Sequence, residues 1–173
     1  MENVALGGFD HSKPNENICE LNVRLVDCGS ITEVTSLTYR SLEVHFGKSW
    51  TRSTDVWPWG IILAQLLQAK VDPKSPGMYD SISTATLEDK TRVACDKLAI
   101  DFDPVSIQLY AEDKECVKML LSPRPEQAYM WANEMVEKGV SGEDVQFLVG
   151  ILTSDPNAHL AVPEILERAY LER

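Results

Sequence analysis

Apolar and polar positions divide this chain into a short β-rich start and a long helical remainder. Between residues 18 and 27 the two classes roughly alternate, which predicts a small β hairpin with its turn near Asn22 and a strand over Val23–Val26. After residue 50 the apolar spacing is that of helices. The predicted helices cover 55–69, 86–98, 106–121, 126–138, a stretch that begins at Ser141, and 162–171.

The two remaining segments are predicted to be loops. Residues 1–17 are rich in Gly, Asn and Pro and have no apolar period, so we expect a loop or a loosely held arm. Residues 28–50 carry only scattered β-branched positions, which also indicates a loop. The pattern as a whole predicts a mainly α fold.

The helix over 55–69 is predicted to be buried at the centre of the fold. Its apolar residues surround the helix axis almost completely, which is typical of a helix covered on every side. They are Ile61, Ile62, Leu63, Leu66 and Leu67. Pro58 fits this helix only in its first turn, where no intrahelical hydrogen bond is lost, and an N-cap at Asp55 places it there.

Composition and charge limit the classes of partner. The chain has 173 residues, enough for one domain with a substantial core. Its 27 acidic and 16 basic side chains give a net charge of −11, which repels phosphate backbones and anionic lipid. We therefore expect a protein partner or a polypeptide substrate, with no nucleic acid and no membrane.

The cysteines and the N-terminus indicate an intracellular protein, cytoplasmic or nuclear. The spacing of the cysteines fits neither a zinc site nor a dense disulfide framework, so we expect reduced, mostly buried thiols. The sequence has no signal-peptide pattern at its start and no apolar run of about 20 residues. The four cysteines are Cys19, Cys28, Cys95 and Cys116.

Three blocks of sequence, residues 23–29, 39–60 and 147–171, resemble the protein kinases and follow one another in the same order. Asp27-Cys28-Gly29 is similar to the Asp-Phe-Gly motif, and Ser41-Leu42-Glu43 to the Ala-Pro-Glu motif that closes the activation segment. Asp55-Val56-Trp57-Pro58-Trp59-Gly60 follows at the start of the predicted central helix. The C-terminal part, 147–171, also resembles the end of a kinase domain, and the whole pattern looks most like the degenerate kinase-like proteins of fungi. The resemblance implies a protein kinase-like C-terminal lobe over 18–173, with 1–17 as a remnant of the catalytic loop.

The resemblance also implies candidate site residues. Asp27 matches the metal-binding aspartate, for which a strand-end aspartate capping a turn is the alternative. Asp10 and Asn15 have the spacing of the catalytic aspartate and its asparagine, but Gly8-Phe9 stand where His-Arg belongs. A second register matches Asn17 and requires an inserted residue, and a loop without any catalytic role is the third possibility. Mg²⁺ and ATP are the cofactors if activity is retained.

Glu43 has a predicted partner far away in the sequence. In the family this glutamate pairs with an arginine in the loop before the last helix, and that position looks like His159 here. A buried glutamate without a permanent cation is costly, and histidine is charged only when it is protonated.

Three functional hypotheses remain open at this point. The chain holds no glycine-rich phosphate loop and no strand lysine, so we expect a pseudokinase or truncated kinase, without the N-terminal lobe, that acts by binding protein. The first alternative is part of an active ATP-dependent protein Ser/Thr kinase whose N-terminal lobe lies outside this chain. The second is an unrelated helical adaptor. Whether the chain is an enzyme is left open.

Overall fold

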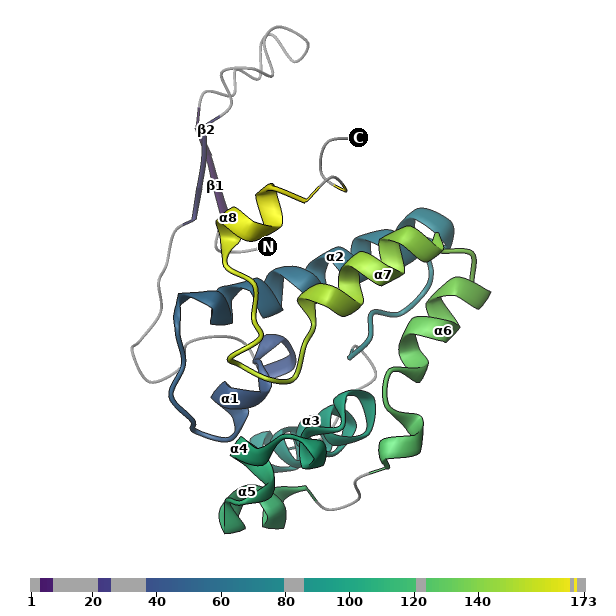
Figure 1. Cartoon of the computed structure of the whole chain (residues 1–173). Helices are drawn as coiled ribbons and strands as arrows, with labels where there is room; N and C mark the ends of the chain where they lie inside the picture. Colours follow the sequence, from purple (N-terminus) through teal and green to yellow (C-terminus); the bar gives the residue numbers. More distant parts are fainter. Residues whose placement is uncertain are drawn as a thin grey trace, which may run out of the picture. The chain divides into compact units, whose positions relative to one another are not determined.

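The computed structural model describes residues 4–7, 22–25, 37–79, 86–120, 124–168 and 170 (Figure 1). The chain divides into two compact units, residues 1–34 and 35–173, and each is described by itself. The sequence prediction treated residues 1–17 separately from 18–173.

The first unit contains two short antiparallel strands. Strand β1 covers Val4–Gly7 and strand β2 covers Asn22–Leu25, with Gly7 opposite Asn22 at one end of the ladder. The prediction of a loop was wrong for Val4–Gly7, where a short apolar run pairs its backbone with a distant segment. The predicted turn at Asn22 was also wrong, because Asn22 is the first residue of β2 and pairs across the ladder.

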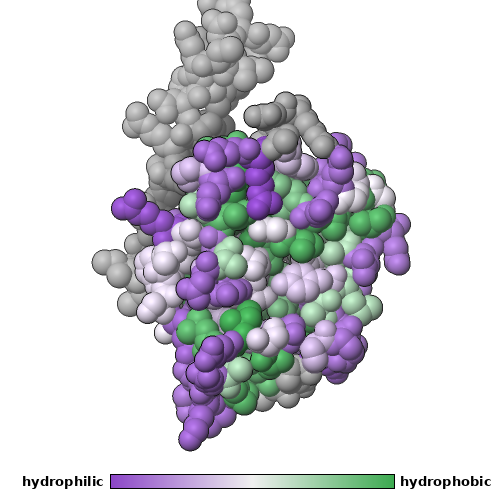
Figure 2. Space-filling view, viewed as in Figure 1, coloured by the Kyte–Doolittle hydropathy of each residue, from purple (hydrophilic) through white to green (hydrophobic). Residues whose placement is uncertain are grey.

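The described residues of the second unit are mainly α, as the sequence predicted. Its helices are α1 (Leu42–His45), α2 (Val56–Val71), α3 (Leu87–Phe102), α4 (Gln108–Ala111), α5 (Lys114–Met119), α6 (Met130–Glu137), α7 (Gly142–Ile151) and α8 (Val162–Leu166). Short 3-10 turns lie at Leu37–Tyr39, Arg52–Asp55, Pro104–Ser106 and Pro125–Gln127. No helix in the described part of the chain is long and apolar enough to cross a membrane. Figure 2 shows polar and apolar side chains interspersed over one face.

Helices α2 and α7 run antiparallel and lie side by side (Figure 1). Their close approach depends on Gly60, because a Cβ atom there would lie 2.8 Å from both Ile151 Cγ2 and Leu152 Cδ2. Trp57, one turn earlier, is buried and packs edge-on against Phe102 at 4.7 Å between ring centroids. These contacts place α2 at the core of the unit, and Asp55 is its N-cap residue, as the sequence predicted.

Helix α2 is not buried on every side, which corrects the sequence prediction. Its Ile62 and Leu66 side chains are 37% and 57% exposed. The tryptophans differ in the same way: Trp57 and Trp131 are core residues, whereas Trp59 is 38% and Trp50 is 56% exposed. An apolar side chain is therefore a poor guide to burial along this segment.

Two predicted helices are interrupted by single residues. In 106–121, Asp113 adopts an extended backbone and its side chain accepts hydrogen bonds from the backbone N–H groups of Glu115 and Cys116, so α4 ends and α5 begins. In 126–138, Tyr129 has a left-handed backbone (φ 59°) that delays the start of α6. Neither change is visible in apolar spacing.

Helix ends were predicted more accurately where a capping residue defines them. Ser141 accepts a hydrogen bond from the Asp144 N–H at the start of α7, and Gly139 has a positive φ of 101° after α6. Helix α3 begins after Thr86, its N-cap residue, and continues past the predicted end at Leu98 to Phe102.

A buried serine joins three segments of the second unit. The Ser154 hydroxyl donates to the Phe102 carbonyl oxygen, and the Tyr110 hydroxyl donates to the Ser154 carbonyl oxygen at 3.3 Å. The Tyr129 hydroxyl lies 3.3 Å from Ser154 Oγ. These bonds hold the segment after α7 against the ends of α3 and α4.

The close packing at Gly60 predicts a stability loss for Gly60→Ala. The added methyl group overpacks the α2–α7 contact, so the free energy of unfolding should fall by about 1–3 kcal/mol in urea denaturation. Gly142→Ala is the matched control, because no atom lies within 4 Å of a Cβ added there and alanine favours the helix. Equal effects of the two substitutions would contradict the role of Gly60.

Candidate functional site

The four site residues predicted from the sequence lie outside the described residues. They are Asp10, Asn15, Asn17 and Asp27. The structure therefore tests neither the catalytic loop nor the metal ligand. The polar groups that it does bring together lie in the second unit.

The predicted partners Glu43 and His159 are brought together in the core, which confirms their pairing. His159 Nδ1 lies 3.7 Å from Glu43 Oε1, and the two side chains are 3% and 0% exposed. The same carboxylate oxygen accepts a hydrogen bond from the Thr54 hydroxyl at 2.9 Å. Glu43 Oε2 is buried without a hydrogen-bond partner among the described residues. The carboxylate thus joins α1, the turn before α2 and the segment before α8.

The second ring nitrogen determines the protonation pattern of His159. Nε2 lies 3.0 Å from the Thr153 carbonyl oxygen, which can only accept, so Nε2 carries a hydrogen. Nδ1 then faces Glu43 with a lone pair when the ring is neutral, and with a proton when it is cationic. At 3.7 Å the contact is electrostatic rather than a hydrogen bond. Glu43 therefore has a cation beside it only when His159 is protonated.

A second histidine, His45 at the end of α1, faces a thiol. Its Nε2–H donates to the Leu37 carbonyl oxygen at 3.1 Å, and its Nδ1 lies 3.7 Å from Cys95 Sγ. Burial, followed by the positive charge of Arg40, lowers the pKa of His45 to about 4, against the effect of the Leu37 bond. Burial also raises the pKa of the Cys95 thiol to about 11. Both groups are neutral near pH 7, so this pair is not an activated nucleophile.

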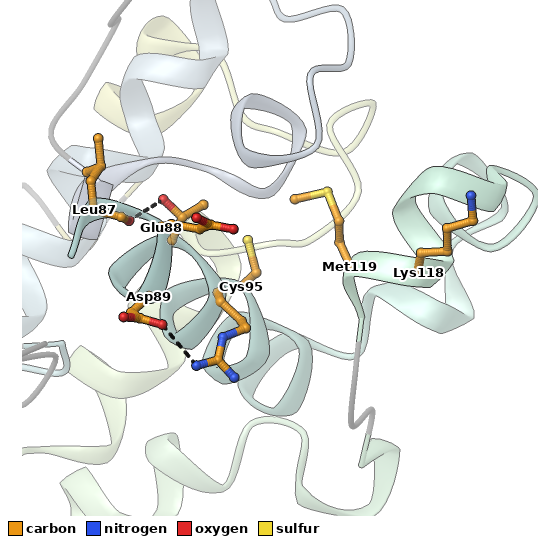
Figure 3. A pocket seen from close by; sticks show the side chains of 8 residues that line it. Leu87, Glu88, Asp89, Cys95, Lys118 and Met119 are labelled. Atoms are coloured by element: carbon orange, nitrogen blue, oxygen red, sulfur yellow. Dashed lines mark hydrogen bonds and ion pairs between the residues drawn. The ribbon is translucent and has the colours of Figure 1, made fainter. Parts of the chain in front are cut away.

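An open, mostly apolar pocket of about 660 Å³ lies between α3 and the end of α5 (Figure 3). Cys95 and Met119 line it, and the charged rim includes Asp89, which pairs with Arg92 at 3.2 Å. The Cys95 thiol is protonated and the ion pair at the rim is solvent-exposed. The pocket therefore offers apolar contacts rather than an activated catalytic group. An apolar side chain of a polypeptide is the kind of group that it fits.

A more polar pocket of about 600 Å³ lies beside the ion pair of Lys48 and Asp113. The hydrogen bond from Lys48, followed by the backbone N–H groups of Cys116 and Glu115, lowers the pKa of Asp113 to about 2. Glu112 and Asp155 also line this pocket, so its walls carry more negative than positive charge. Among the described residues no cluster of His, Cys, Asp or Glu side chains is suited to hold a metal ion.

Sequence reasoning missed several of these contacts. No role was predicted for His45, and nothing in the sequence indicated that Cys95 would lie beside it. The ion pair of Lys48 and Asp113 was not predicted either, because helices α2, α3 and α4 lie between the two residues in the sequence. Only the buried state of Cys95 and Cys116, both free thiols, was expected from cysteine spacing.

Comparison of the chain with models of known protein families finds no match, and no curated protein matches its sequence at a significant level.

The lowered pKa of His45 predicts a loss of stability in mild acid. The unfolded chain binds a proton at His45 below about pH 6.5, whereas the folded chain does so only near pH 4. The contribution of His45 to the free energy of unfolding should therefore be constant above about pH 6.5 and fall by up to about 1.4 kcal/mol per pH unit between about pH 6.5 and pH 4. His45→Gln keeps a donor for Leu37 and removes this proton.

Urea denaturation of both proteins at several pH values tests this. Between about pH 7 and pH 5 the unmodified chain should lose about 2 kcal/mol more than His45→Gln. An identical pH dependence in the two proteins would show that His45 is not buried in its neutral form.

Proposed function

We propose that the chain is a protein kinase-like C-terminal lobe, with a small β hairpin near its N-terminus, that acts by binding a polypeptide rather than by phosphoryl transfer. The contact between Glu43 and His159 carries this proposal. The kinase resemblance named these two residues as partners from separate sequence blocks, and nothing else in the sequence links them. Their approach to 3.7 Å in a buried site is unexpected for two unrelated positions.

The kinase-like residues 55–60 support the same interpretation. Residues 55–60 precede and begin the central helix α2, with Trp57 buried and Gly60 in close contact with the end of α7. The end of α7 belongs to the C-terminal block of the resemblance. Two kinase-like blocks that are distant in sequence, residues 39–60 and 147–171, therefore meet at α2.

A non-catalytic role follows from the residues that the chain holds. Residues 1–173 contain no G-x-G-x-x-G frame and no Val-Ala-x-Lys strand to hold the phosphates of ATP. Asp27 alone would bind Mg²⁺ weakly, because a single carboxylate is a poor site for that ion. In the second unit, the neutral Cys95–His45 pair provides no nucleophile.

A polypeptide is the class of partner that the surface favours. The net charge of −11 favours a partner with basic residues, and the polar pocket places Glu112 and Asp155 at its walls. The apolar pocket beside Cys95 is open to a side chain of the partner.

If His159 occupies the position of the family arginine, His159→Arg should stabilise the fold. A guanidinium supplies a permanent charge and several donors to Glu43, including its Oε2 atom, which has no partner among the described residues. We expect the free energy of unfolding near pH 7 to rise by about 1–3 kcal/mol. Urea denaturation measures the change.

His45→Arg is the matched control. It places the same group in a part-buried site that faces the Cys95 thiol and the Leu37 carbonyl, and it should destabilise the chain. The gain from His159→Arg should also disappear in the presence of Glu43→Gln. Destabilisation by His159→Arg as large as that of the control would contradict the proposed lineage.

Thermal melting with and without Mg²⁺ and ATP distinguishes the proposed function from its alternatives. ATP at about 100 times its Kd would add about 2.7 kcal/mol of stability, so a binding-competent chain would show a clear rise in Tm. We expect no rise, in the unmodified chain or in Asp27→Asn. A rise only in the unmodified chain would favour part of an active kinase with a nucleotide site at Asp27. No rise together with a destabilising His159→Arg would favour an unrelated helical adaptor.

A further inference from the structure

The outward side of α2 carries an exposed apolar stripe. Trp59, Ile62 and Leu66 recur at intervals of three and four residues and are 38%, 37% and 57% exposed. This spacing places them along one side of the helix, next to the side that packs on α7, and the Trp59 ring lies edge-on to Phe147 of α7 with 6.2 Å between the ring centroids. The stripe is bounded by exposed charged residues, Asp55 before it and Lys70 after it.

The stripe is uncharged in a strongly charged protein. Residues 56–69 contain no charged side chain, although the chain has a net charge of −11. No described residue forms an ion pair with Asp55 or Lys70. An apolar surface with unpaired charges of opposite sign at its two ends is complementary to a second copy of itself in the antiparallel orientation.

The residues of the stripe and its two end charges are spaced symmetrically along α2, as a self-complementary surface requires. Trp59 and Leu66 lie equally far from the midpoint between Ile62 and Leu63, and so do Asp55 and Lys70. A two-fold axis through that midpoint places Trp59 against the partner's Leu66 and Asp55 against the partner's Lys70. Each contact then occurs twice, as in any two-fold interface between identical chains.

We propose that the outward side of α2 is the interface of a homodimer, in which two copies of this chain pack their α2 helices antiparallel. The occupant of the stripe is a second copy, because the charges at its ends are complementary to their own image. This inference goes beyond the proposed function and does not depend on the kinase resemblance.

The size of the contact indicates a weak dimer. Helix α2 has 16 residues, which corresponds to about 24 Å of helix. Two such helices packed along one stripe bury less surface than a standard stable interface of about 1,600 Å². We therefore expect a dissociation constant in the micromolar range or weaker, and a monomer at low concentration.

Exchange of the two charges tests the proposed arrangement. Asp55→Lys places two positive charges at each end of the dimer, and Lys70→Glu places two negative charges there. Each single variant should weaken the dimer about tenfold, as measured by sedimentation velocity over a concentration series at low salt. The double variant Asp55→Lys/Lys70→Glu restores opposite charges and should dimerise within about threefold of the unmodified chain.

Two controls separate dimerisation from general effects of charge and stability. Lys114→Glu makes the same charge change on an exposed position of α5, away from the stripe, and should leave the dimer unchanged. Thermal melting at low concentration shows whether each variant is folded. Leu66→Glu, which puts a charge inside the stripe, should abolish the dimer.

Three results would overturn the proposal. The first is a chain that stays monomeric up to about 1 mM. The second is a dimer that neither single charge variant weakens. The third is a double variant as weak as the single ones, because only the antiparallel two-fold arrangement predicts recovery.

Discussion

The second unit depends on one buried carboxylate. Glu43 is fully buried, and its Oε1 atom receives the Thr54 hydroxyl at 2.9 Å and faces His159 at 3.7 Å. Burying a carboxylate is favourable only when nearby groups compensate for the lost water. The three segments that supply or approach this oxygen cannot separate without leaving it uncompensated. Glu43 therefore links α1 to the entry into α2 by a hydrogen bond, and to the segment before α8 by an electrostatic contact.

The central helix meets two different demands. One side of α2 needs a glycine, because the end of α7 lies within contact distance of the backbone at Gly60. The side next to it carries large apolar side chains that are partly exposed, such as Leu66 and Trp59, and the Trp59 ring also contacts Phe147 of α7. Gly60 leaves no room for a side chain, whereas the neighbouring side presents large side chains to the solvent. A helix with both properties fits a position between the core of its own domain and another surface.

The sequence predicted the elements whose signals are local. The start of α7 follows from the capping bond of Ser141, which acts on the adjacent turn, whereas Asp55 precedes α2 without a side-chain capping bond. The break at Asp113 was missed because the capping bond that causes it competes with a continuous helical pattern. The left-handed Tyr129 was missed because no sequence pattern marks a non-glycine residue at positive φ.

Contacts between distant residues were predictable only through the family resemblance. It named Glu43 and His159, and the structure confirms their approach, whereas the contact of His45 with Cys95 had no such guide. Apolar spacing gives the face of a helix but not its neighbour, so pairs of this kind depend on the packing of the whole unit. The predicted residues Asp10, Asn15, Asn17 and Asp27 lie outside the described residues and stay predictions.

The two partners of Glu43 become available at different times during synthesis of the chain. Thr54 follows Glu43 closely in the chain, whereas His159 is added roughly 100 residues later, which takes on the order of 10 seconds at ribosomal rates. Throughout that interval the nascent chain contains the carboxylate of Glu43 and the hydroxyl of Thr54 but not the histidine. The buried site of Glu43 can therefore be completed only after residue 159 has been added to the chain.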